Sequence, residues 1–259
     1  MLSDAQLNHY HDHGFVVPDF RIPNDVMDAI DTHTAALIDA HPEFRDNCSA
    51  LLREDMSFAQ YCEVPGLLDM VTQVIGPDIA LWNMSLFGKP AHNGKATPWH
   101  QDGEYWPIRP LATCTVWIAI DDSNEENGCL RVIRGSHRAQ QLAKHRHNPS
   151  EDFTLFEELL DSEFNEADAV DIHLERGQVS LHDVYLMHGS APNRSAHRRR
   201  GMTMRLMPTT SVYDRNVANE MFERRGGRIN LAHHPVLLLR GADRTGRNEF
   251  HPNHTEGSV

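Results

Sequence analysis

The chain has 259 residues, of which 40% are hydrophobic and 24% are charged, a composition that excludes disordered and fibrous architectures. Its 24 Lys and Arg residues against 37 Asp and Glu residues give a formal net charge of −13, which repels nucleic-acid phosphates and anionic membrane surfaces. No apolar run approaches the ~18 residues that a membrane-spanning helix requires. We therefore expect a globular protein with neither nucleic acid nor membrane as a partner.

Cysteine usage indicates a reducing environment. The four cysteines show no C-x-x-C spacing, and the N-terminus has no charged segment followed by an apolar one, as a secretory signal would have. We expect a cytoplasmic protein with buried, unreactive thiols at Cys48, Cys62, Cys114 and Cys129.

The first part of the chain, residues 1–78, is predicted to be mainly helical. Ser3 can cap a first helix through its hydroxyl group, and Gly14 can end it. The apolar periodicity predicts helices over residues 3–13, from Asn24 to just before Pro42, and over about 57–75, with a brief strand at 15–17.

From Ile79 onwards, short apolar or alternating runs are separated by turn-rich pieces. Runs of this kind are typical of a β-sandwich or barrel and not of alternating βαβ units. We therefore expect a mainly β core with flanking helices, over 79–210, within a single domain of residues 1–259. The runs cover residues 79–88, 113–120, 129–133, 170–174, 178–187 and 201–207.

Two further stretches differ from this core pattern. Residues 211–259 form a C-terminal extension that is polar from residue 241 onwards. Residues 139–168 form a polar and acidic insert, whose apolar positions predict a helix that is either a lid across the barrel mouth or a cover for a sheet edge. These apolar positions are Phe153, Leu155, Phe156, Leu159 and Leu160.

Two stretches carry candidate metal ligands. In Trp99-His100-Gln101-Asp102, an extended backbone places the side chains of His100 and Asp102 on one face, because strand side chains alternate. His188, at the end of an apolar run, is the best candidate for a third ligand. The three would form a 2-His-1-carboxylate triad, which leaves positions open on ferrous iron for oxygen and a co-substrate.

The residues after His188 make this hypothesis more specific. The stretch His188-Gly189-Ser190-Ala191-Pro192-Asn193-Arg194-Ser195 is followed by Arg199, eleven residues after the histidine. Residues 2–6, 14–17 and 128–137 add to the pattern. Together these stretches resemble the phytanoyl-CoA dioxygenase family of Fe(II)- and 2-oxoglutarate-dependent oxygenases. The resemblance implies a double-stranded β-helix, a cupin-like jelly-roll barrel with helices outside one sheet.

The resemblance also implies roles for individual residues. His100, Asp102 and His188 match the family's iron ligands, and Arg199 matches the arginine that pairs with the far carboxylate of 2-oxoglutarate. A guanidinium group suits this anion because it can donate two charge-assisted hydrogen bonds. Ser190 matches a position whose hydroxyl group assists the same carboxylate.

Several polar and aromatic positions keep two interpretations. Trp106 matches an aromatic position that lines the family's pocket, but an ordinary core tryptophan is equally consistent with the sequence. Asn83 and Lys89 share one face of the strand before the first metal motif, where they either contact the co-substrate or substrate or face solvent. Gly103 stands where some relatives have a hydroxyl-bearing residue, so co-substrate binding would rely more on the residues named above.

The remaining histidines are expected to have no catalytic role. His182 and His137 are interpreted as structural residues, because the iron needs no further protein ligand. Solvent-facing positions are expected for histidines in polar segments, namely His92, His145, His147, His233 and His234.

The implied reaction is hydroxylation of an unactivated C–H bond, with O2 and 2-oxoglutarate consumed and succinate and CO2 released. Asp102 argues against the halogenating branch, in which the missing carboxylate makes room for halide. Arg131 and Arg205, with Lys89 and Trp106, could line a polar pocket. Such a pocket favours a small anionic or zwitterionic substrate, such as an amino acid derivative or an aminophosphonate, bound by a monomer or homodimer.

Two alternatives use the same residues. A jelly-roll module that only binds a small molecule would need the barrel, but no arginine placed to hold a dicarboxylate. A zinc-dependent hydrolase could position a metal-bound water with His100, Asp102 and His188, and would need neither oxygen nor 2-oxoglutarate.

Overall fold

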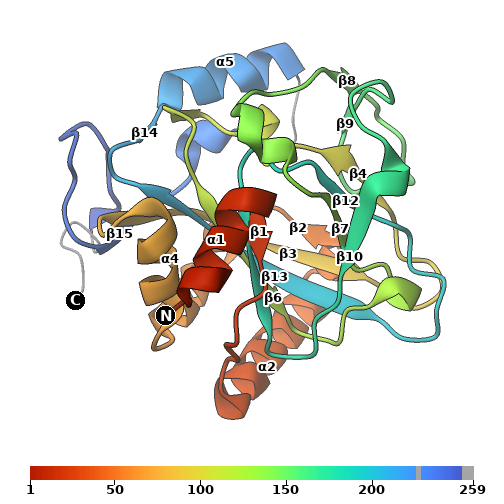
Figure 1. The fold of residues 1–259 in the computed structure, drawn as a ribbon. Helices are drawn as coiled ribbons and strands as arrows, with labels where there is room; N and C mark the ends of the chain where they lie inside the picture. The colour runs from red at the N-terminus through yellow and green to blue at the C-terminus, as the bar shows by residue number, and fades with distance from the viewer. Residues whose placement is uncertain (226–228, 253–259) are drawn as a thin grey trace.

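The fold, obtained as a computed structural model, is described for residues 1–225 and 229–252. Two antiparallel sheets form its centre, and Figure 1 shows the helices α1, α2 and α4 gathered to one side of the larger sheet, away from the smaller one. This agrees with the predicted mainly β core and its flanking helices. None of the helices in these residues has both the length and the apolar character needed to cross a bilayer.

The larger sheet has seven strands, in the order β1-β11-β6-β13-β3-β15, with β2 also paired to β3. The central strand β13 is paired along both edges, with β3 on one side and with β6 on the other. The bounds are β1 Phe15–Val16, β2 Asn47–Cys48, β3 Ile79–Lys89, β6 Cys114–Ala119, β11 Val179–Asp183, β13 Arg199–Pro208 and β15 Leu237–Arg240.

The smaller sheet has four strands in the order β10-β7-β12-β4, and β14-β5 and β8-β9 form two further two-stranded sheets, of which β9 packs beside β4. Side chains from both main sheets face a shared cavity, which is where the site described below lies. The bounds are β4 Thr97–His100, β5 Ile108–Arg109, β7 Leu130–Ile133, β8 His145–His147, β9 Glu157–Leu159, β10 Ala169–Ile172, β12 His188–Ser190 and β14 Val212–Tyr213.

The first helix, α1 (Asp4–His13), begins and ends where the sequence predicts. The Ser3 hydroxyl accepts from the backbone N–H of Gln6, and the Gln6 side chain accepts from the Ser3 N–H in return, which forms a capping box. Gly14 has a φ of 83° and donates its N–H to the Tyr10 carbonyl, so it closes the helix in the left-handed conformation that glycine tolerates best.

The main apolar core lies between the helices and the outer face of the larger sheet. The second helix, α2 (Asn24–Ala40), buries Met27, Ile30 and Thr34, which follow the spacing of one helix face. From the sheet, Met202 and Met204 of β13 enter the same cluster, so the alternate residues of that strand point the other way, towards the smaller sheet. The shorter helices that complete this layer are α3 Leu51–Glu54 and α4 Leu67–Ile75.

The third predicted helix, over residues 57–75, is wrong as a continuous element. The chain forms a 3-10 helix over Met56–Glu63, and α4 begins only at Leu67. Pro65 explains the break, because a residue that precedes proline is driven out of the helical region, and Val64 has an extended ψ of 123°.

The predicted helix within residues 139–168 is also wrong. This insert forms the antiparallel pair of β8 and β9, in which His145 lies opposite Leu159. Its apolar residues lie in two different environments: Leu159 is buried, and Leu155 lines the cavity between the sheets. Pairing with a neighbouring strand therefore overrode the helical spacing.

The C-terminal extension packs back onto the barrel. β14 pairs with β5, β15 extends the larger sheet, and the helix α5 (Arg215–Arg225) lies between them in the chain. Residues 253–259, the end of the predicted polar tail, fall outside the described residues.

The burial of the cysteines, and of two histidines expected to face solvent, differs in how far it follows the sequence. All four cysteines are free and buried, as predicted, and burial raises the pKa of Cys48 and Cys129 to about 12. The solvent-facing position expected for His145 is wrong, because its ring accepts from the Gln101 N–H in a covered position. The same expectation is wrong for His234, whose side chain is only 1% exposed.

His234 makes the stability of the fold sensitive to acid. Burial, and then the charges of Arg53, Arg205 and Arg215, lower the pKa of His234 to about 3. An unfolded histidine titrates near 6.5, so between these two values the unfolded chain binds more protons than the native one. Stability is therefore lost as the pH falls below about 6.5.

We expect the free energy of unfolding to fall by up to ~2 kcal/mol between pH 6.5 and pH 5 on account of this residue. His234→Gln should remove that part of the slope, while His233→Gln should keep it, because His233 is exposed. Urea denaturation at both pH values measures this difference. Equal slopes in the two variants would contradict the account of His234.

Candidate metal centre

The three predicted metal ligands converge between the two sheets. His100 ends β4 and His188 begins β12, and the register of these two strands places the histidines opposite each other. Asp102 follows β4 after one extended residue, Gln101, so the predicted alternation holds although the strand itself ends at His100. The three offer ligand atoms that all lie within 4.8 Å of one another.

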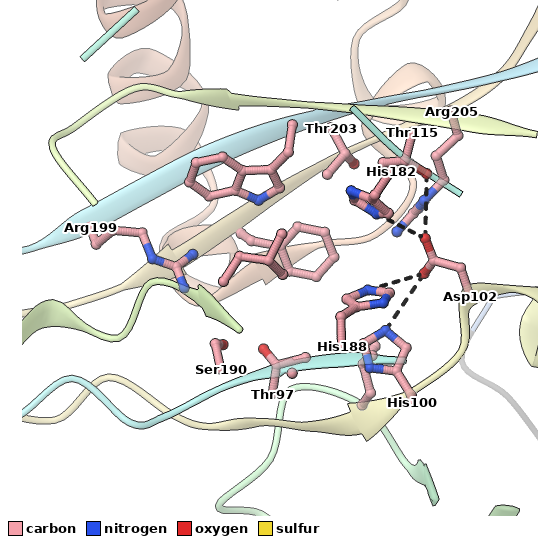
Figure 2. Close-up of a pocket in the computed structure, with 15 residues that line it drawn as sticks. Thr97, His100, Asp102, Thr115, His182, His188, Ser190, Arg199, Thr203 and Arg205 are labelled. Carbon is pink, nitrogen blue, oxygen red and sulfur yellow. Dashed lines mark hydrogen bonds and ion pairs between the residues drawn. The ribbon is translucent and has the colours of Figure 1, made fainter. Parts of the chain in front are cut away.

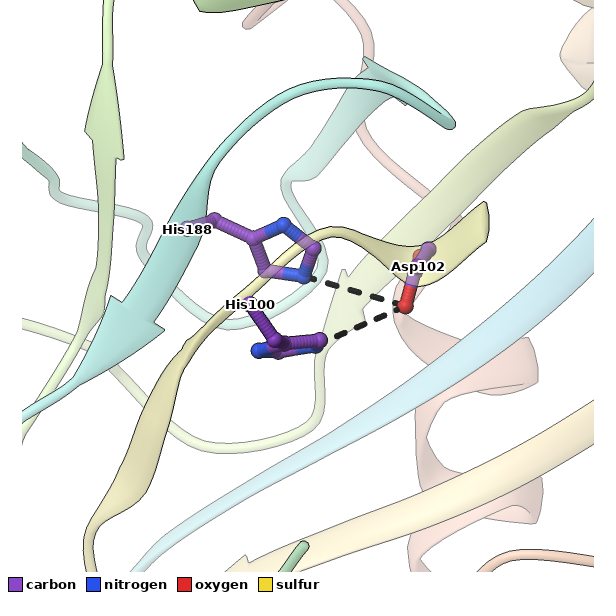
Figure 3. A group of neighbouring side chains, drawn as sticks. All are labelled: His100, Asp102 and His188. Carbon is purple, nitrogen blue, oxygen red and sulfur yellow. Dashed lines mark ion pairs between the residues drawn. The ribbon is translucent and has the colours of Figure 1, made fainter. Parts of the chain in front are cut away.

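The geometry of this triad suits a cation, as Figure 3 shows. Asp102 Oδ1 lies 3.5 Å from His100 Nε2 and 3.9 Å from His188 Nε2. All three side chains are buried. Two imidazoles and one carboxylate that meet in this way form a set suited to ferrous iron with positions left open.

Backbone carbonyl groups fix the orientation of the His100 and His188 rings on the side away from the centre of the triad. His100 Nδ1 is 2.8 Å from the Pro98 carbonyl, and His188 Nδ1 is 2.8 Å from the Leu186 carbonyl. A carbonyl only accepts, so each Nδ1 carries the proton and each Nε2 presents a lone pair to the centre. The protein thereby prepares the tautomer that a metal ion binds.

The charge states of the triad are also those of a metal site. Burial, and then the neighbouring ring of His100, hold the pKa of His188 well below its usual value, so this ring is neutral. Burial by itself raises the pKa of Asp102, but the imidazoles of His100 and His182 that face its carboxylate outweigh it, and the pKa lies well below its usual value. A neutral imidazole beside an ionised carboxylate is the form that coordinates metals.

Arg199 lies in the same cavity, on the larger sheet. Figure 2 shows its guanidinium group on the far side of the cavity from Asp102. It is buried, and its Nη2 donates to the Gly128 carbonyl while its Nε has no partner among the described residues. Burial lowers the pKa of Arg199 to about 10, so it stays charged at neutral pH.

A buried cation with one carbonyl contact is incompletely satisfied. Charges buried in proteins are normally paired, because their loss of hydration is costly. No salt bridge to Arg199 occurs within the described part of the chain. The free donors of its guanidinium group therefore fit an anionic ligand that enters the cavity.

Trp117 of β6 supports Arg199 from one side. The guanidinium carbon lies 5.4 Å from the centre of the indole ring, a cation–π contact. The ring reaches this place across Gly201 of β13, where a Cβ atom would come within 2.0 Å of Trp117 Cζ2. Glycine within this strand is therefore required by the close approach of a ring to the backbone.

Ser190 lies between the metal triad and Arg199. It belongs to β12, two residues after His188, and it pairs with Thr97 of β4. Both hydroxyl-bearing side chains line the cavity (Figure 2). The structure thus brings Ser190 and Arg199 into the same cavity as the metal triad.

Asn83 and Lys89 share a face of β3, as predicted, but they do not line the cavity. Asn83 donates to the Ser49 carbonyl at 2.9 Å, and the Lys89 ammonium group donates to the Lys95 carbonyl. Phe87, between them on the strand, is the side chain of β3 that reaches the cavity. The expected contact of Asn83 and Lys89 with the co-substrate is therefore not supported by their positions.

Trp106 and Arg131 also lie outside the cavity. Trp106 packs against Trp82, with ring centres 4.8 Å apart, in an apolar cluster, which is the alternative interpretation of this residue. Arg131 follows Leu130 on β7, and because Leu130 faces the cavity, Arg131 points outwards and forms salt bridges with Glu166 and Asp171. Its expected role in a substrate pocket is wrong for this reason.

Arg205 is the predicted substrate residue that does line the cavity. Its Nη1 donates to Ser85 Oγ at 2.7 Å, and its guanidinium carbon lies 5.2 Å from the ring centre of Trp106. Burial lowers the pKa of Arg205, and the nearby charge of Asp102 acts in the opposite direction.

Sequence reasoning missed several residues of the cavity wall. His182, expected to be only structural, faces the cavity, whereas His137, whose Nε2 donates to the His11 carbonyl, does not. The available signal was strand alternation, because Ser180 and His182 alternate with the apolar Val179 and Leu181 along β11. The other wall residues not predicted are Phe87, Thr97, Thr115, Trp117, Leu130, Gly189 and Thr203.

Comparison with known proteins matches residues 10–201 to the profile described as Phytanoyl-CoA dioxygenase (PhyH). The chain belongs to the phytanoyl-CoA dioxygenase family. Iron(II) and 2-oxoglutarate, the cofactors predicted from the sequence, are those of Fe/2-oxoglutarate oxygenases, and the buried triad and unpaired Arg199 fit both of them.

The matches to relatives in this family cover about half of each relative's length. The chain is 33% identical over 158 residues to the peroxisomal phytanoyl-CoA dioxygenase of Homo sapiens, covering 58% of this chain and 46% of the human protein. It is 31% identical over 140 residues to a probable alpha-ketoglutarate-dependent hypophosphite dioxygenase of Stutzerimonas stutzeri, covering 52% of this chain and 47% of that protein. The chain thus spans about half the length of these relatives.

Solved structures confirm the predicted jelly-roll class of the family. The non-heme monooxygenase ThoJ has a TM-score of 0.71 and 25% identity, covering 96% of this chain and 89% of ThoJ. EctD from S. alaskensis with bound Fe has a TM-score of 0.67 at 19% identity, covering 82% and 79%. EvdO2 from Micromonospora carbonacea var. aurantiaca complexed with 2-oxoglutarate has a TM-score of 0.65 at 17% identity, covering 80% and 91%.

Arg199 and its neighbour Arg198 provide a matched test of co-substrate binding. Arg198 is 59% exposed and faces Asp31 and Asp121 outside the cavity. Charge-assisted hydrogen bonds contribute about 1.5–3 kcal/mol, so Arg199→Gln should weaken 2-oxoglutarate binding about 10- to 100-fold, and Arg198→Gln should leave it unchanged. Calorimetric titration of the metal-loaded protein under anaerobic conditions measures both. A similar loss in both variants, or in neither, would refute the assignment.

Proposed function

We propose that this chain is an Fe(II)- and 2-oxoglutarate-dependent dioxygenase that hydroxylates an unactivated C–H bond of a small anionic or zwitterionic metabolite. The observation that supports this most directly is the buried, unpaired guanidinium group of Arg199 in the same cavity as the His100, Asp102 and His188 triad. A metal site by itself is compatible with many reactions. A metal site that shares its cavity with the buried charge of Arg199 favours a reaction in which the protein also binds an anion.

The residues of the chain would divide the work as follows. His100, Asp102 and His188 would hold the iron, whose chemistry with O2 and 2-oxoglutarate supplies the oxidation and releases succinate and CO2. Arg199 would orient the far carboxylate of 2-oxoglutarate through two parallel hydrogen bonds, with Ser190 beside it. The apolar walls of Phe87, Leu130 and Leu155 would exclude water from the reaction.

Arg205 supports the proposed class of substrate. It is a second buried cation in the cavity wall, at the end of the cavity where Asp102 lies, whereas Arg199 lies at the other end. A substrate with a carboxylate or another small oxyanion would compensate its charge. The relative from Stutzerimonas stutzeri, whose described substrate is hypophosphite, gives further support for a small anion. Amino acid derivatives and aminophosphonates belong to the same chemical class.

The two alternatives are weaker on the same observations. A zinc hydrolase would use the triad but would have no need of Arg199, and a binding module without turnover would have no need of a triad that leaves metal positions open. Oxygen dependence separates the three possibilities, because only the dioxygenase consumes O2.

The decisive experiment measures O2 uptake and succinate formation with Fe(II), 2-oxoglutarate and a panel of small anionic and zwitterionic metabolites. We expect both signals to require all three components, and we expect His188→Ala to reduce them to background while its circular dichroism stays native. His173→Ala is the matched control, because His173 is exposed. Product formation without oxygen, or unchanged turnover in His188→Ala, would exclude the proposed function.

A further inference from the structure

A row of polar side chains crosses the larger sheet beneath the metal triad. The registers place His182 of β11 opposite Thr115 of β6, and Thr115 opposite Arg205 of β13. Directly opposed residues of a sheet point to the same face, and all three line the cavity (Figure 2). The smaller sheet therefore supplies the histidine ligands, and the larger sheet supplies this row opposite them.

Two residues of this row, His182 and Thr115, lie close to one carboxylate oxygen of Asp102, Oδ2. Oδ1 faces the ligand histidines, at 3.5 Å from His100 Nε2 and 3.9 Å from His188 Nε2. Oδ2 faces the row, at 3.5 Å from His182 Nε2 and 3.4 Å from Thr115 Oγ1. The carboxylate is thus held from two sides, with one oxygen on each.

His182 is the member of the row that is most free to hold Asp102. Arg205 already donates to Ser85 and lies among aromatic rings, so its contribution is mainly its charge. His182 is 2% exposed, and apart from the Asp102 carboxylate neither of its ring nitrogens has a polar partner among the described residues. A buried imidazole with this single neighbour is most readily explained by that neighbour.

We propose that His182 is a positioning residue that holds Oδ2 of Asp102, so that Asp102 presents only Oδ1 to the metal. Without this hold, the carboxylate would turn and bind through both oxygens, and the second oxygen would occupy a position that the co-substrate or O2 needs. The inference rests on the proposed metal site, and it assigns to the larger sheet the control of how that site is coordinated.

Two amide substitutions separate this role from simple packing. In His182→Gln the side-chain nitrogen replaces Nε2, the atom that faces Asp102, whereas in His182→Asn it replaces Nδ1, which does not. Ser180→Ala is the control on the same face of β11, because Ser180 makes no contact with Asp102. Thr115→Val removes the other donor to Oδ2 without altering His182.

The measurement is anaerobic titration of the purified full chain with Co(II), in which the visible spectrum reports the coordination number and the titration gives the affinity. Loss of an outer partner of a metal ligand typically costs 10- to 100-fold in affinity, so we expect about this loss and an altered spectrum in His182→Asn. His182→Gln and Ser180→Ala should match the wild type within about threefold, and Thr115→Val should be weakened severalfold.

Three results would overturn the inference. One is a wild-type affinity and spectrum in His182→Asn, and another is an equal loss in His182→Gln and His182→Asn, which would mean that ring packing matters and the donor does not. The third is a 10- to 100-fold loss in Thr115→Val, which would make Thr115 and not His182 the main hold on Oδ2, and this result can be read even if an amide variant does not fold. A wild-type chain that binds no Co(II) at all would instead refute the proposed metal site itself.

Discussion

The cost of holding charges away from water between two sheets is the constraint on which this structure depends. A buried carboxylate or guanidinium group is strongly unfavourable unless opposite charge or hydrogen bonds compensate it. Asp102 is compensated by three imidazoles and by the charge of Arg205. Among the described residues, Arg199 has only the Gly128 carbonyl and the face of Trp117 as partners. In the proposed function, a metal dication and a dicarboxylate complete this balance.

Each sheet contributes a different part of the site. The smaller sheet brings His100 and His188 together because β4 and β12 pair at these residues, and the same pairing places Ser190 beside Thr97. The larger sheet contributes the cations and the polar row, because residues 199, 203 and 205 of β13 share a face while Met202 and Met204 enter the main core. The reactive space therefore exists only when both sheets are formed and face each other.

The sequence predicts those parts of the structure that are encoded locally. The Ser3 cap and the Gly14 end of α1, the strand runs and the spacing from His188 to Arg199 are short-range patterns, and the structure shows each of them. The insert was not predictable, because the pairing of β8 with β9 outweighed its apolar spacing. Arg131 illustrates a second reason, since which face of a four-residue strand points inwards depends on the partner strands. His182 shows a third, because its role depends on Asp102, which is 80 residues away in the chain.

One strand, β13, carries both arginines that line the cavity, Arg199 at its first residue and Arg205 six residues later. The strand rise fixes the separation of their backbones at roughly 20 Å. An insertion of one residue between them would turn one arginine into the apolar core, and an insertion of two would keep the facing but lengthen the strand by about 7 Å. Single-residue insertions and deletions within 200–204 therefore reverse the facing of one of the two arginines, whereas length changes in surface loops leave their relative facing intact.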